Sequence, residues 1–402
     1  MEFIWILSAI FAAACQTARS AFQKNMISRL GDYGAAYIRF CYALPFTSLI
    51  WFVWINIPGN TIPILSNVKI EADEKGISLI ATDLDLEIIE KVEANVSKAG
   101  STTVSAHILY DIVRKIPEGS SIEIEQNHDD QMELKSGQSN FDLPCLPDED
   151  FPEMSSGEMS CNFNMNSKDI TRLIDKTKFA ISTEETRYYL NGIFLHSINN
   201  ELRSVATDGH RLACIKSDLP KGAEEMPSII IPRKTVGEIR KLLEDSSDDL
   251  IIKVSDTKIQ FILKDVQLTS KLIDGTFPDY ERVIPKSNDK ELSIETKIFS
   301  SSIDRVATIS TDKSKAVKFL LKDSALTLTV INPDAGTAVE TTPVDYNHEE
   351  LEIGFNARYL LDIASQIDGP DMLFALEGSG SPALIKDSDD AQATYVLMPM
   401  RV

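Results

Sequence analysis

A repeat of about sixty residues constrains the fold of this 402-residue chain more than any other feature. Short segments of helical period begin near Ala106, Lys168, Pro232, Thr296 and Phe355, so successive starts are 62, 64, 64 and 59 residues apart. Segments of alternating, strand-like period lie between them. A fixed period of this length means that one supersecondary unit is used several times. The sequence therefore predicts an α+β chain built of strand-helix-strand units.

Short words recur at twice this period, which indicates that two units form one domain. Ala81-Thr82-Asp83 returns 125 residues later as Ala206-Thr207-Asp208, and Phe151-Pro152 returns 126 residues later as Phe277-Pro278. Asn332-Pro333-Asp334 follows Thr207 by the same 125 residues. The chain is also too long for one typical core. We therefore predict three domains, at 61–155, 156–284 and 285–402.

Hairpin patterns support the strand assignment. The ranges 68–72 and 77–81 alternate around the turn Asp73-Glu74-Lys75-Gly76, and similar pairs are 251–254 with 259–262 and 319–321 with 326–330. The repeat also predicts a further helix near residue 44, but an uncharged apolar run lies there instead.

The first sixty residues differ from the rest of the chain. Two apolar runs, 3–18 and 40–57, flank a short loop that carries Arg19, Lys24, Arg29 and Arg39. This pattern predicts an apolar helical hairpin at 1–60, either in a membrane or as a pair of buried helices. In a membrane, the basic loop would lie in the cytoplasm and everything after Asn60 on the far side.

Charge and cysteine content limit the possible functions. Lys and Arg number 40 and Asp and Glu number 61, so the net charge is −21 and the overall field does not attract nucleic acid. Every predicted repeat helix nevertheless carries basic residues, and helices that face one way would form a basic surface for a phosphate backbone. The five cysteines are scattered without a C-x-x-C pair, which favours a reducing compartment and excludes a zinc site or a disulfide framework.

The chain has no recognisable catalytic motif. Asp208-Gly209-His210 could suggest an acid/base pair, but no nucleophile stands at a recognisable elbow. Gly378-Ser379-Gly380 lacks the third glycine of a dinucleotide loop, and the chain has no P-loop. We predict an accessory protein with no catalytic residue, no metal ion and no cofactor.

Several words in fixed order carry a resemblance to a known family. They are Thr61-Ile62-Pro63-Ile64-Leu65, Ala81-Thr82-Asp83-Leu84, Ile116-Pro117-Glu118-Gly119, Arg187 to Gly192, Ala206 to Leu212, Ser270 to Gly275, Phe277-Pro278-Asp279-Tyr280, Ile353-Gly354-Phe355-Asn356 and Val396 to Arg401. Through them, residues 61–402 resemble the beta sliding clamp, the processivity subunit of bacterial DNA polymerase III. Residues 1–60 resemble in texture the first two helices of an EamA-like drug/metabolite membrane transporter.

The resemblance implies a fold and a mechanism. Clamps of this family are head-to-tail homodimeric rings of three similar domains per chain, with sheets outside and two helices per domain lining a hole for duplex DNA. Such a ring holds DNA without sequence preference and tethers the polymerase topologically. The implied partners are duplex DNA, a second copy of the chain, and peptides of the replicative polymerase and the clamp loader. The implied location is the cytoplasm, with possible membrane association through 1–60.

The resemblance also implies two sets of site residues. A hydrophobic pocket for partner peptides with a Gln and bulky Leu or Phe anchors would comprise Leu190, Thr207, Gly209, His210, Arg211, Leu212, Pro278, Arg282, Val283, Asn356, Tyr359, Val396, Met398, Pro399, Met400 and Arg401. The DNA-facing set would comprise Arg114, Lys115, Arg172, Lys176, Tyr188, Tyr189, Arg233, Lys234, Arg240, Lys241, Arg305 and Arg358.

The chain departs from the family at its first domain. The family begins that domain with a strand and a ring-lining helix, which should occupy roughly residues 36–60, where the second apolar run stands. We therefore predict a chimera whose first domain lacks these elements, and with them part of the ring interface that it shares with the neighbour's third domain near Thr308 and Ile309. Two functions follow: a DNA-tethering clamp, or a membrane-anchored or non-functional chimera that keeps only the peptide pocket.

Overall fold

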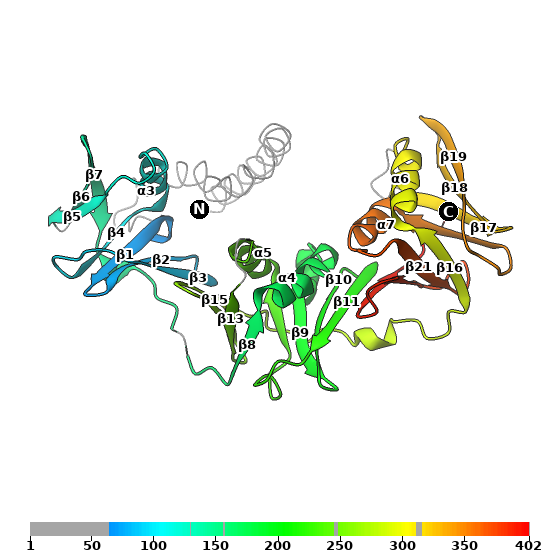
Figure 1. Ribbon diagram of the computed structural model, residues 1–402, viewed down its shortest axis with the longest axis horizontal. Coiled ribbons are helices and arrows are strands. Elements are labelled where there is room, and N and C mark those ends of the chain that lie inside the picture. The colour runs from blue at the N-terminus through cyan, green and yellow to red at the C-terminus, as the bar shows by residue number, and fades with distance from the viewer. Residues whose placement is uncertain (1–63, 129, 156, 245–247, 311–315, 402) are drawn as a thin grey trace, which may run out of the picture. The chain divides into compact units, whose positions relative to one another are not determined.

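The computed structural model describes residues 64–128, 130–155, 157–244, 248–310 and 316–401. These residues form two compact units, the first made of 64–81 with 92–152 and the second of 82–91 with 153–401 (Figure 1). The apolar hairpin predicted for 1–60 lies outside the described residues. Within the described ranges, no helix is long and apolar enough to cross a membrane.

The first unit is a sheet with one helix. Its elements are η1 (Ile64–Ser66), β1 (Asn67–Asp73), β2 (Gly76–Thr82), β4 (Gly100–Ser105), α3 (Ala106–Val113), β5 (Glu123–His128), β6 (Gln131–Ser136), β7 (Ser139–Leu146) and η2 (Asp148–Asp150). The strands are antiparallel in the order β5-β6-β7-β4-β1-β2. Its buried cluster consists of Val68, Ile70, Val104, Met132, Leu143 and Cys145. Helix α3 adds partly buried residues to this cluster but no fully buried one.

The second unit contains four α-helices and three groups of antiparallel strands. The helices are α4 (Ser167–Asp175), α5 (Arg233–Leu242), α6 (Thr296–Ala307) and α7 (Ala357–Ala364), with 3-10 turns η3 (Lys178–Ala180), η4 (Glu185–Leu190) and η5 (Tyr280–Arg282). One group of strands is β3 (Leu86–Val92), β15 (Val266–Lys271), β14 (Lys258–Leu263), β13 (Asp249–Val254) and β8 (Cys161–Asn166), in that spatial order.

The other two groups complete the unit. An eight-stranded sheet has the order β12 (Ile229–Pro232), β9 (Gly192–Ile198), β10 (Glu201–Thr207), β11 (Arg211–Asp218), β23 (Ala393–Leu397), β22 (Ala383–Asp387), β21 (Asp371–Leu376) and β16 (Lys290–Glu295). A four-stranded sheet has the order β19 (Gly336–Pro343), β18 (Ala325–Asn332), β17 (Ala316–Lys322) and β20 (Leu351–Asn356). The β11–β23 pairing makes one sheet continuous from the predicted second domain into the third.

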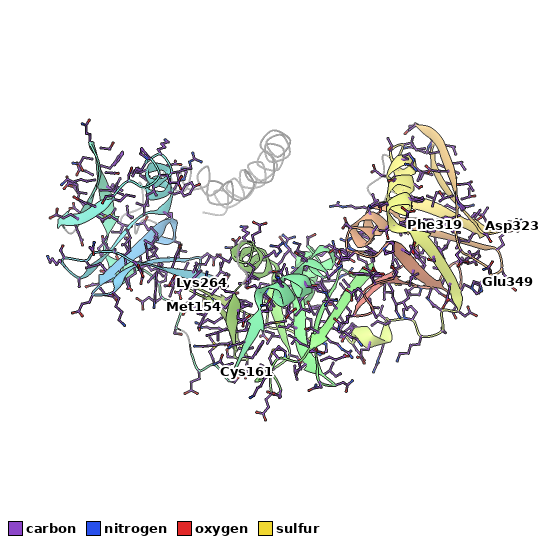
Figure 2. All side chains as sticks on the ribbon, in the orientation of Figure 1. Met154, Cys161, Lys264, Phe319, Asp323 and Glu349 are labelled. Carbon is purple, nitrogen blue, oxygen red and sulfur yellow. The ribbon has the colours of Figure 1, made fainter. Side chains whose placement is uncertain are left out.

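The helices of the second unit pack in pairs and cover one large core. Helix α4 contacts α5, α6 contacts α7, and all four lie against the strands (Figure 1). The core includes Phe319 on β17, which meets the rings of Phe299 and Phe355 edge-on at centroid distances of 6.0 and 5.2 Å (Figure 2). Edge-to-face aromatic pairs of this kind add to the stabilisation that burial provides.

The repeat predicted the elements well. The observed helices begin at Ala106, Ser167, Arg233, Thr296 and Ala357, each within two residues of the start that the sequence predicts. The three predicted hairpins are the pairs β1–β2, β13–β14 and β17–β18. The predicted α+β class and its repeated strand-helix-strand units are thereby confirmed.

The repeated word Ala-Thr-Asp recurs because it builds the same turn twice. Thr207 Oγ1 donates to the carbonyl of Arg211 at 2.7 Å and accepts from the N–H of Gly209 at 3.1 Å. Thr82 Oγ1 makes the matching bonds, to Leu86 and from Leu84, both at 3.0 Å. In both turns the residue after the aspartate has a positive φ, +87° for Gly209 and +76° for Leu84. Glycine adopts this conformation without strain, whereas leucine does not.

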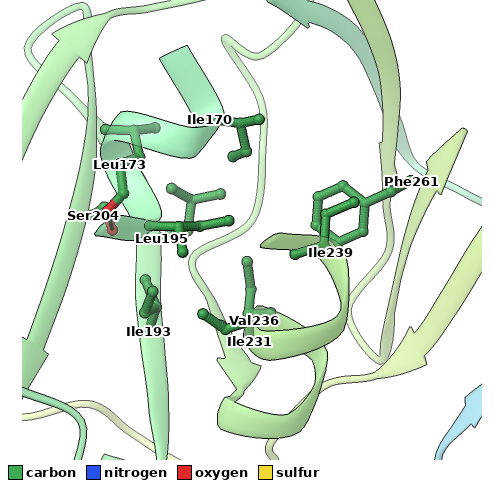
Figure 3. Close-up of a pocket in the computed structure, with 10 residues that line it drawn as sticks. Ile170, Leu173, Ile193, Leu195, Ser204, Ile231, Val236, Ile239 and Phe261 are labelled. Carbon is green, nitrogen blue, oxygen red and sulfur yellow. Dashed lines mark hydrogen bonds between the residues drawn. The ribbon is translucent and has the colours of Figure 1, made fainter. Parts of the chain in front are cut away.

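One apolar cavity lies inside the second unit. It has a volume of about 10 Å³ and lies between α4, α5 and strands β9, β10, β12 and β14 (Figure 3). Its single polar side chain, Ser204, already donates to the carbonyl of Leu173 at 3.2 Å. A space this small and apolar is a packing imperfection and not a ligand site.

Candidate functional site

The residues predicted for the peptide pocket converge on the junction between β11 and β23. Register pairs Arg211 with Leu397 and Leu212 with Val396. Beyond the strand end, the N–H of Met398 donates to the carbonyl of His210 at 2.9 Å. The N–H of Met400 donates to Gly354, at the end of β20, at 2.8 Å. Residues from the second and third predicted domains are therefore held together by backbone hydrogen bonds.

The floor of this surface is a hydrophobic cluster separate from the main core. This outer cluster comprises Leu190, Val205, Leu212, Cys214, Ile230, Phe277, Tyr280 and Val396. Three of its members, Leu190, Leu212 and Val396, belong to the predicted pocket, and each is at most 4% exposed. Burial raises the pKa of the Cys214 thiol to about 11, so this cysteine is an unreactive packing residue.

The rim of the surface is exposed and partly apolar. Met398 is 38% exposed and Val283 is 45% exposed. Pro278, Gly209 and His210 are also exposed. The side chain of Arg282 forms a solvent-exposed ion pair with Asp279 at 2.7 Å. A buried apolar floor with an exposed methionine at its edge can accept bulky side chains of different shapes.

Arg211 is predicted as a pocket residue, but its guanidinium already makes three hydrogen bonds within the chain. It binds Asp208 at 3.1 Å, Asp362 of α7 at 2.5 Å and the carbonyl of Phe179 at 2.6 Å. Its carbon Cζ lies 4.3 Å from the ring centroid of Tyr359. Arg211 therefore ties β11 to α7.

Two further predicted pocket residues also have structural partners. The side chain of Asn356 caps α7 by accepting from the N–H of Arg358 at 2.9 Å. Tyr359 on the first turn of α7 stacks on His210 at a centroid distance of 6.4 Å. Burial raises the pKa of the Tyr359 hydroxyl, so the ring presents a neutral face. His210 and Tyr359 together form an aromatic side of the surface.

The predicted DNA-facing residues are mostly paired with acidic partners. Lys176 is 6% exposed and binds Asp368 at 2.7 Å, and Arg172 binds Asp390 at 2.7 Å. The further pairs are Arg240 with Asp175, Lys241 with Glu238, Lys234 with Asp83, Arg305 with Glu340, and, in the first unit, Arg114 with Asp111 at 3.9 Å. Lys115 follows Arg114 at the end of α3 and is exposed. Exposed ion pairs are weak enough to exchange for a phosphate, but the buried Lys176 is held in place.

The ion pairs also change the pKa of an acidic partner. Burial opposes the change, but hydrogen bonds from Arg240 and Lys178 hold the pKa of Asp175 below its ordinary value. Within the described ranges, Arg233 and Arg358 are exposed and make no ion pair. These two and Lys115 are therefore the members of the predicted set most available to an anion.

Tyr188 and Tyr189 lie together on η4, near the start of β9. Their rings meet edge-on at 5.8 Å, and Tyr188 is 55% exposed. A Cβ added to Gly275 would come within 3.1 Å of Tyr189, so a glycine lets the tyrosines lie close to this loop. Tyr188 is thus exposed to solvent, while the adjacent Tyr189 packs against Gly275.

Sequence reasoning missed the polar groups beneath the rim. His196 on β9 and Arg203 on β10 are 7% and 8% exposed, and both contact the hydroxyl of Tyr280. In the sequence they look like ordinary polar residues on half-exposed strands, and only the register Arg203 to His196 brings them together. In the part of the chain that the structure describes, no group of three or more His, Cys, Asp or Glu could hold a metal ion.

Comparison with known proteins gives consistent matches along the described chain. Three family descriptions match in order: the N-terminal domain of the DNA polymerase III beta subunit over 57–155, its central domain over 164–279 and its C-terminal domain over 281–401. A beta sliding clamp of Caulobacter vibrioides is 49% identical over 348 residues, which are 85% of this chain and 94% of the relative. That of Escherichia coli strain K12 is 36% identical over 345 residues, with shares of 85% and 93%.

Solved structures agree with these matches. A DnaN sliding clamp from Bartonella birtlesii, bound to griselimycin, has a TM-score of 0.83 and 51% identity and covers 86% of this chain and 94% of its own. A Caulobacter crescentus beta sliding clamp with PEG bound to a putative beta-motif tethering region has a TM-score of 0.83 and 48% identity, with shares of 86% and 93%.

Proposed function

The chain belongs to the family of DNA polymerase III beta subunits, the beta sliding clamps, and we propose that it tethers partners through the surface at the β11–β23 junction. Members of this family are processivity factors without a catalytic site of their own. The observation that carries the proposal is the outer cluster, a buried apolar floor in the same compact unit as the exposed Met398 and Val283. The occupant would be an extended or partly helical peptide with a Gln and Leu or Phe anchors. The division at 61–155, 156–284 and 285–402 is part of this proposal.

We further propose that the chain forms a head-to-tail ring with a second copy and encircles duplex DNA in the cytoplasm. Arg233 and Arg358, on α5 and α7, would meet the phosphate backbone first, and the exposed pairs of Arg240 and Arg305 would exchange their carboxylates for phosphates. Tyr188 would add an aromatic contact. Such a grip does not depend on base sequence, which suits sliding.

The peptide surface can be tested with a matched pair of substitutions. Met398→Ala removes a 38% exposed side chain at the rim, and Ile251→Ala removes a 37% exposed side chain on β13, away from the surface. With a fluorescein-labelled peptide carrying Gln, Leu and Phe, polarisation should show about a five- to thirtyfold loss of affinity for Met398→Ala only, since interface anchors contribute about 1–2 kcal/mol each. Equal affinity of both variants and the wild type would rule out this surface as the binding site.

The alternative is a membrane-anchored or non-functional chimera that keeps only the peptide surface. It rests on the apolar runs at 3–18 and 40–57. Fractionation of cells that express the full chain, alongside residues 61–402, separates the two functions. Retention on nicked circular DNA after loading supports the ring, whereas peptide binding in a detergent-dependent fraction without DNA retention supports the anchored chimera.

A further inference from the structure

One wall of the proposed peptide surface is a short segment, residues 277–284, that belongs to no strand. Pro278, Arg282 and Val283 project from it into solvent, and its only regular structure is the single turn of η5. Backbone support within the segment is slight, since the N–H of Val283 donates to the carbonyl of Tyr280 at 3.0 Å. An exposed segment of this kind would sample many conformations unless side chains fixed it.

Aromatic stacking fixes the beginning of the segment. The ring of Phe277 lies parallel to that of Phe194 on β9, with centroids 4.7 Å apart and an interplanar angle of 4°. The other neighbour of Phe194 is the ring of His196, at 4.6 Å and 25°. Phe277 is 7% exposed, so this end of the segment is anchored on β9.

Hydrogen bonds fix its middle. The hydroxyl of Tyr280, a residue that is 5% exposed, lies 3.0 Å from Nε2 of His196 and 3.2 Å from Nη1 of Arg203. The guanidinium can only donate, so the tyrosine oxygen accepts from Arg203, which leaves its O–H to donate to Nε2 of His196. The neutral histidine that carries its proton on Nδ1 satisfies this arrangement.

Arg203 holds the segment at a second point. Its Nη1 binds the carboxylate of Glu281 at 2.6 Å, while Nε and Nη2 bind Glu201 on the same strand at 3.0 and 2.9 Å. The guanidinium thus contacts two consecutive residues of the segment, Tyr280 and Glu281. Charge-assisted bonds from a buried guanidinium are geometrically specific, which makes this a rigid attachment.

From this geometry we propose that His196, Arg203 and Tyr280 are positioning residues, which hold the 277–284 segment in the conformation that binds partner peptides. The inference rests on the proposed peptide-binding function of the surface. Tyr280 and Phe277 belong to the same outer cluster as the floor residues Leu190, Leu212 and Val396. Wall and floor are therefore one packed body, and a peptide meets a surface whose ordering cost has already been met in the free protein.

The test compares two tyrosine hydroxyls. Tyr280→Phe keeps the ring and removes the bonds to His196 and Arg203. Tyr346→Phe is the matched control, because Tyr346 is also buried, at 2% exposed, and its hydroxyl donates to the carbonyl of Glu349 at 2.6 Å, remote from this surface. Both variants lose one buried hydroxyl. With the fluorescein-labelled peptide, we expect about a three- to tenfold weaker Kd for Tyr280→Phe, the size of one net hydrogen bond, and no change for Tyr346→Phe.

A second pair of variants tests the charge. Arg203→Lys keeps a cation that can reach Glu281, whereas Arg203→Met keeps only the length of the side chain. We expect Arg203→Lys to bind the peptide more tightly than Arg203→Met, at equal helical content by circular dichroism. Equal weakening in both would contradict the positioning role of the charge.

Amide hydrogen exchange reports the conformation directly and needs no partner. The amides of residues 281–284 should exchange faster in Tyr280→Phe than in the wild type or in Tyr346→Phe, and saturating peptide should remove the difference. If the wild type does not bind the peptide, the proposed function fails, while faster exchange at 281–284 would still confirm the anchor. Unchanged exchange and unchanged Kd in Tyr280→Phe would overturn the inference.

Discussion

His196 links the stability of the second unit to pH. Burial lowers the pKa of its imidazole below the ordinary value, and the positive charge of Arg203 adds to the effect, although Glu281 opposes it. The neighbouring hydroxyl of Tyr280, whose pKa burial raises to about 12, stays protonated throughout the physiological range. The neutral form of His196 is thus the one that the fold favours, in agreement with the hydrogen bond that Tyr280 donates to it.

The sign of the pH effect follows from this lowered pKa. The unfolded chain binds the histidine proton more readily than the folded one. The contribution of His196 to the free energy of unfolding is therefore complete above the unfolded pKa of about 6.5, and it is lost as the pH falls through the folded pKa. We expect His196→Gln to flatten the dependence of the free energy of unfolding on pH below about 6.5, where one proton contributes at most about 1.4 kcal/mol per pH unit. Urea unfolding between pH 5 and 8 measures it.

His348 provides the control for this measurement. It is exposed and accepts from the N–H of Glu291 at 3.1 Å, so His348→Gln makes the same exchange of residue types outside the buried network of His196. Parallel curves for His196→Gln and the wild type would contradict the assignment of a neutral, buried histidine.

These residues also mark the limit of what the sequence alone could predict. The words around Thr207 and Met398 pointed to the surface because they recur or match a family. His196 and Arg203 carry no such signal, since their partners lie 84 and 77 residues away, at Tyr280. Lys176 looked like a solvated helix cation, but burial next to Asp368 makes it part of the packing between α4 and the loop after α7. Only tertiary contacts could reveal these roles.

Helices and hairpins were easier to predict than side-chain partners because local patterns determine them. The period of the apolar residues located the five α-helices of the described ranges, and turn patterns located the hairpins. The pairing of β11 with β23 was not predictable in this way, because the two strands are separated by more than 170 residues and neither alternates more clearly than its neighbours. Long-range sheet order depends on packing that no local pattern encodes.

The β17–β18 hairpin contains a local strain that a substitution can relieve. It turns through Asp323 and Ser324, whose φ angles are +53° and +56°, and Asp323 lies at its tip (Figure 2). Two residues of positive φ form the turn type that suits a two-residue hairpin, and glycine adopts it without a Cβ penalty. We expect Ser324→Gly to raise the free energy of unfolding by about 0.5–1 kcal/mol, measured by urea denaturation.

The neighbouring hairpin gives the opposite control. Gly336, the first residue of β19, has a φ of +104°, so Gly336→Ala places a Cβ where the backbone disfavours one. It should lower the free energy of unfolding in the same assay. A loss of stability in Ser324→Gly would mean that the 3.4 Å hydrogen bond from the Ser324 hydroxyl to the carbonyl of Tyr346 stabilises the fold more than relief of the backbone strain does.

The two compact units differ in the amount of core that the described residues provide. In the second unit, the helix pairs α4–α5 and α6–α7 contribute buried residues to one large cluster. In the first unit, α3 has no buried residue, and Ile108 and Val113 on its surface are 43% and 41% exposed. Burial of apolar surface is the main stabilising term, so the described part of the first unit is the less stable one.

This difference predicts two steps of unfolding in the full chain. We expect the protection of amides in β1 and β4 to disappear at lower urea than that of amides in β10 and β11, as measured by hydrogen exchange. Peptide affinity should persist through the first step, because the floor, the rim and the anchors of the peptide surface all lie in the second unit. DNA retention by the proposed ring should be lost in that step, because the family resemblance assigns part of the ring interface to the first domain. Simultaneous loss of protection in all four strands would show instead that other contacts couple the two units into one cooperative body.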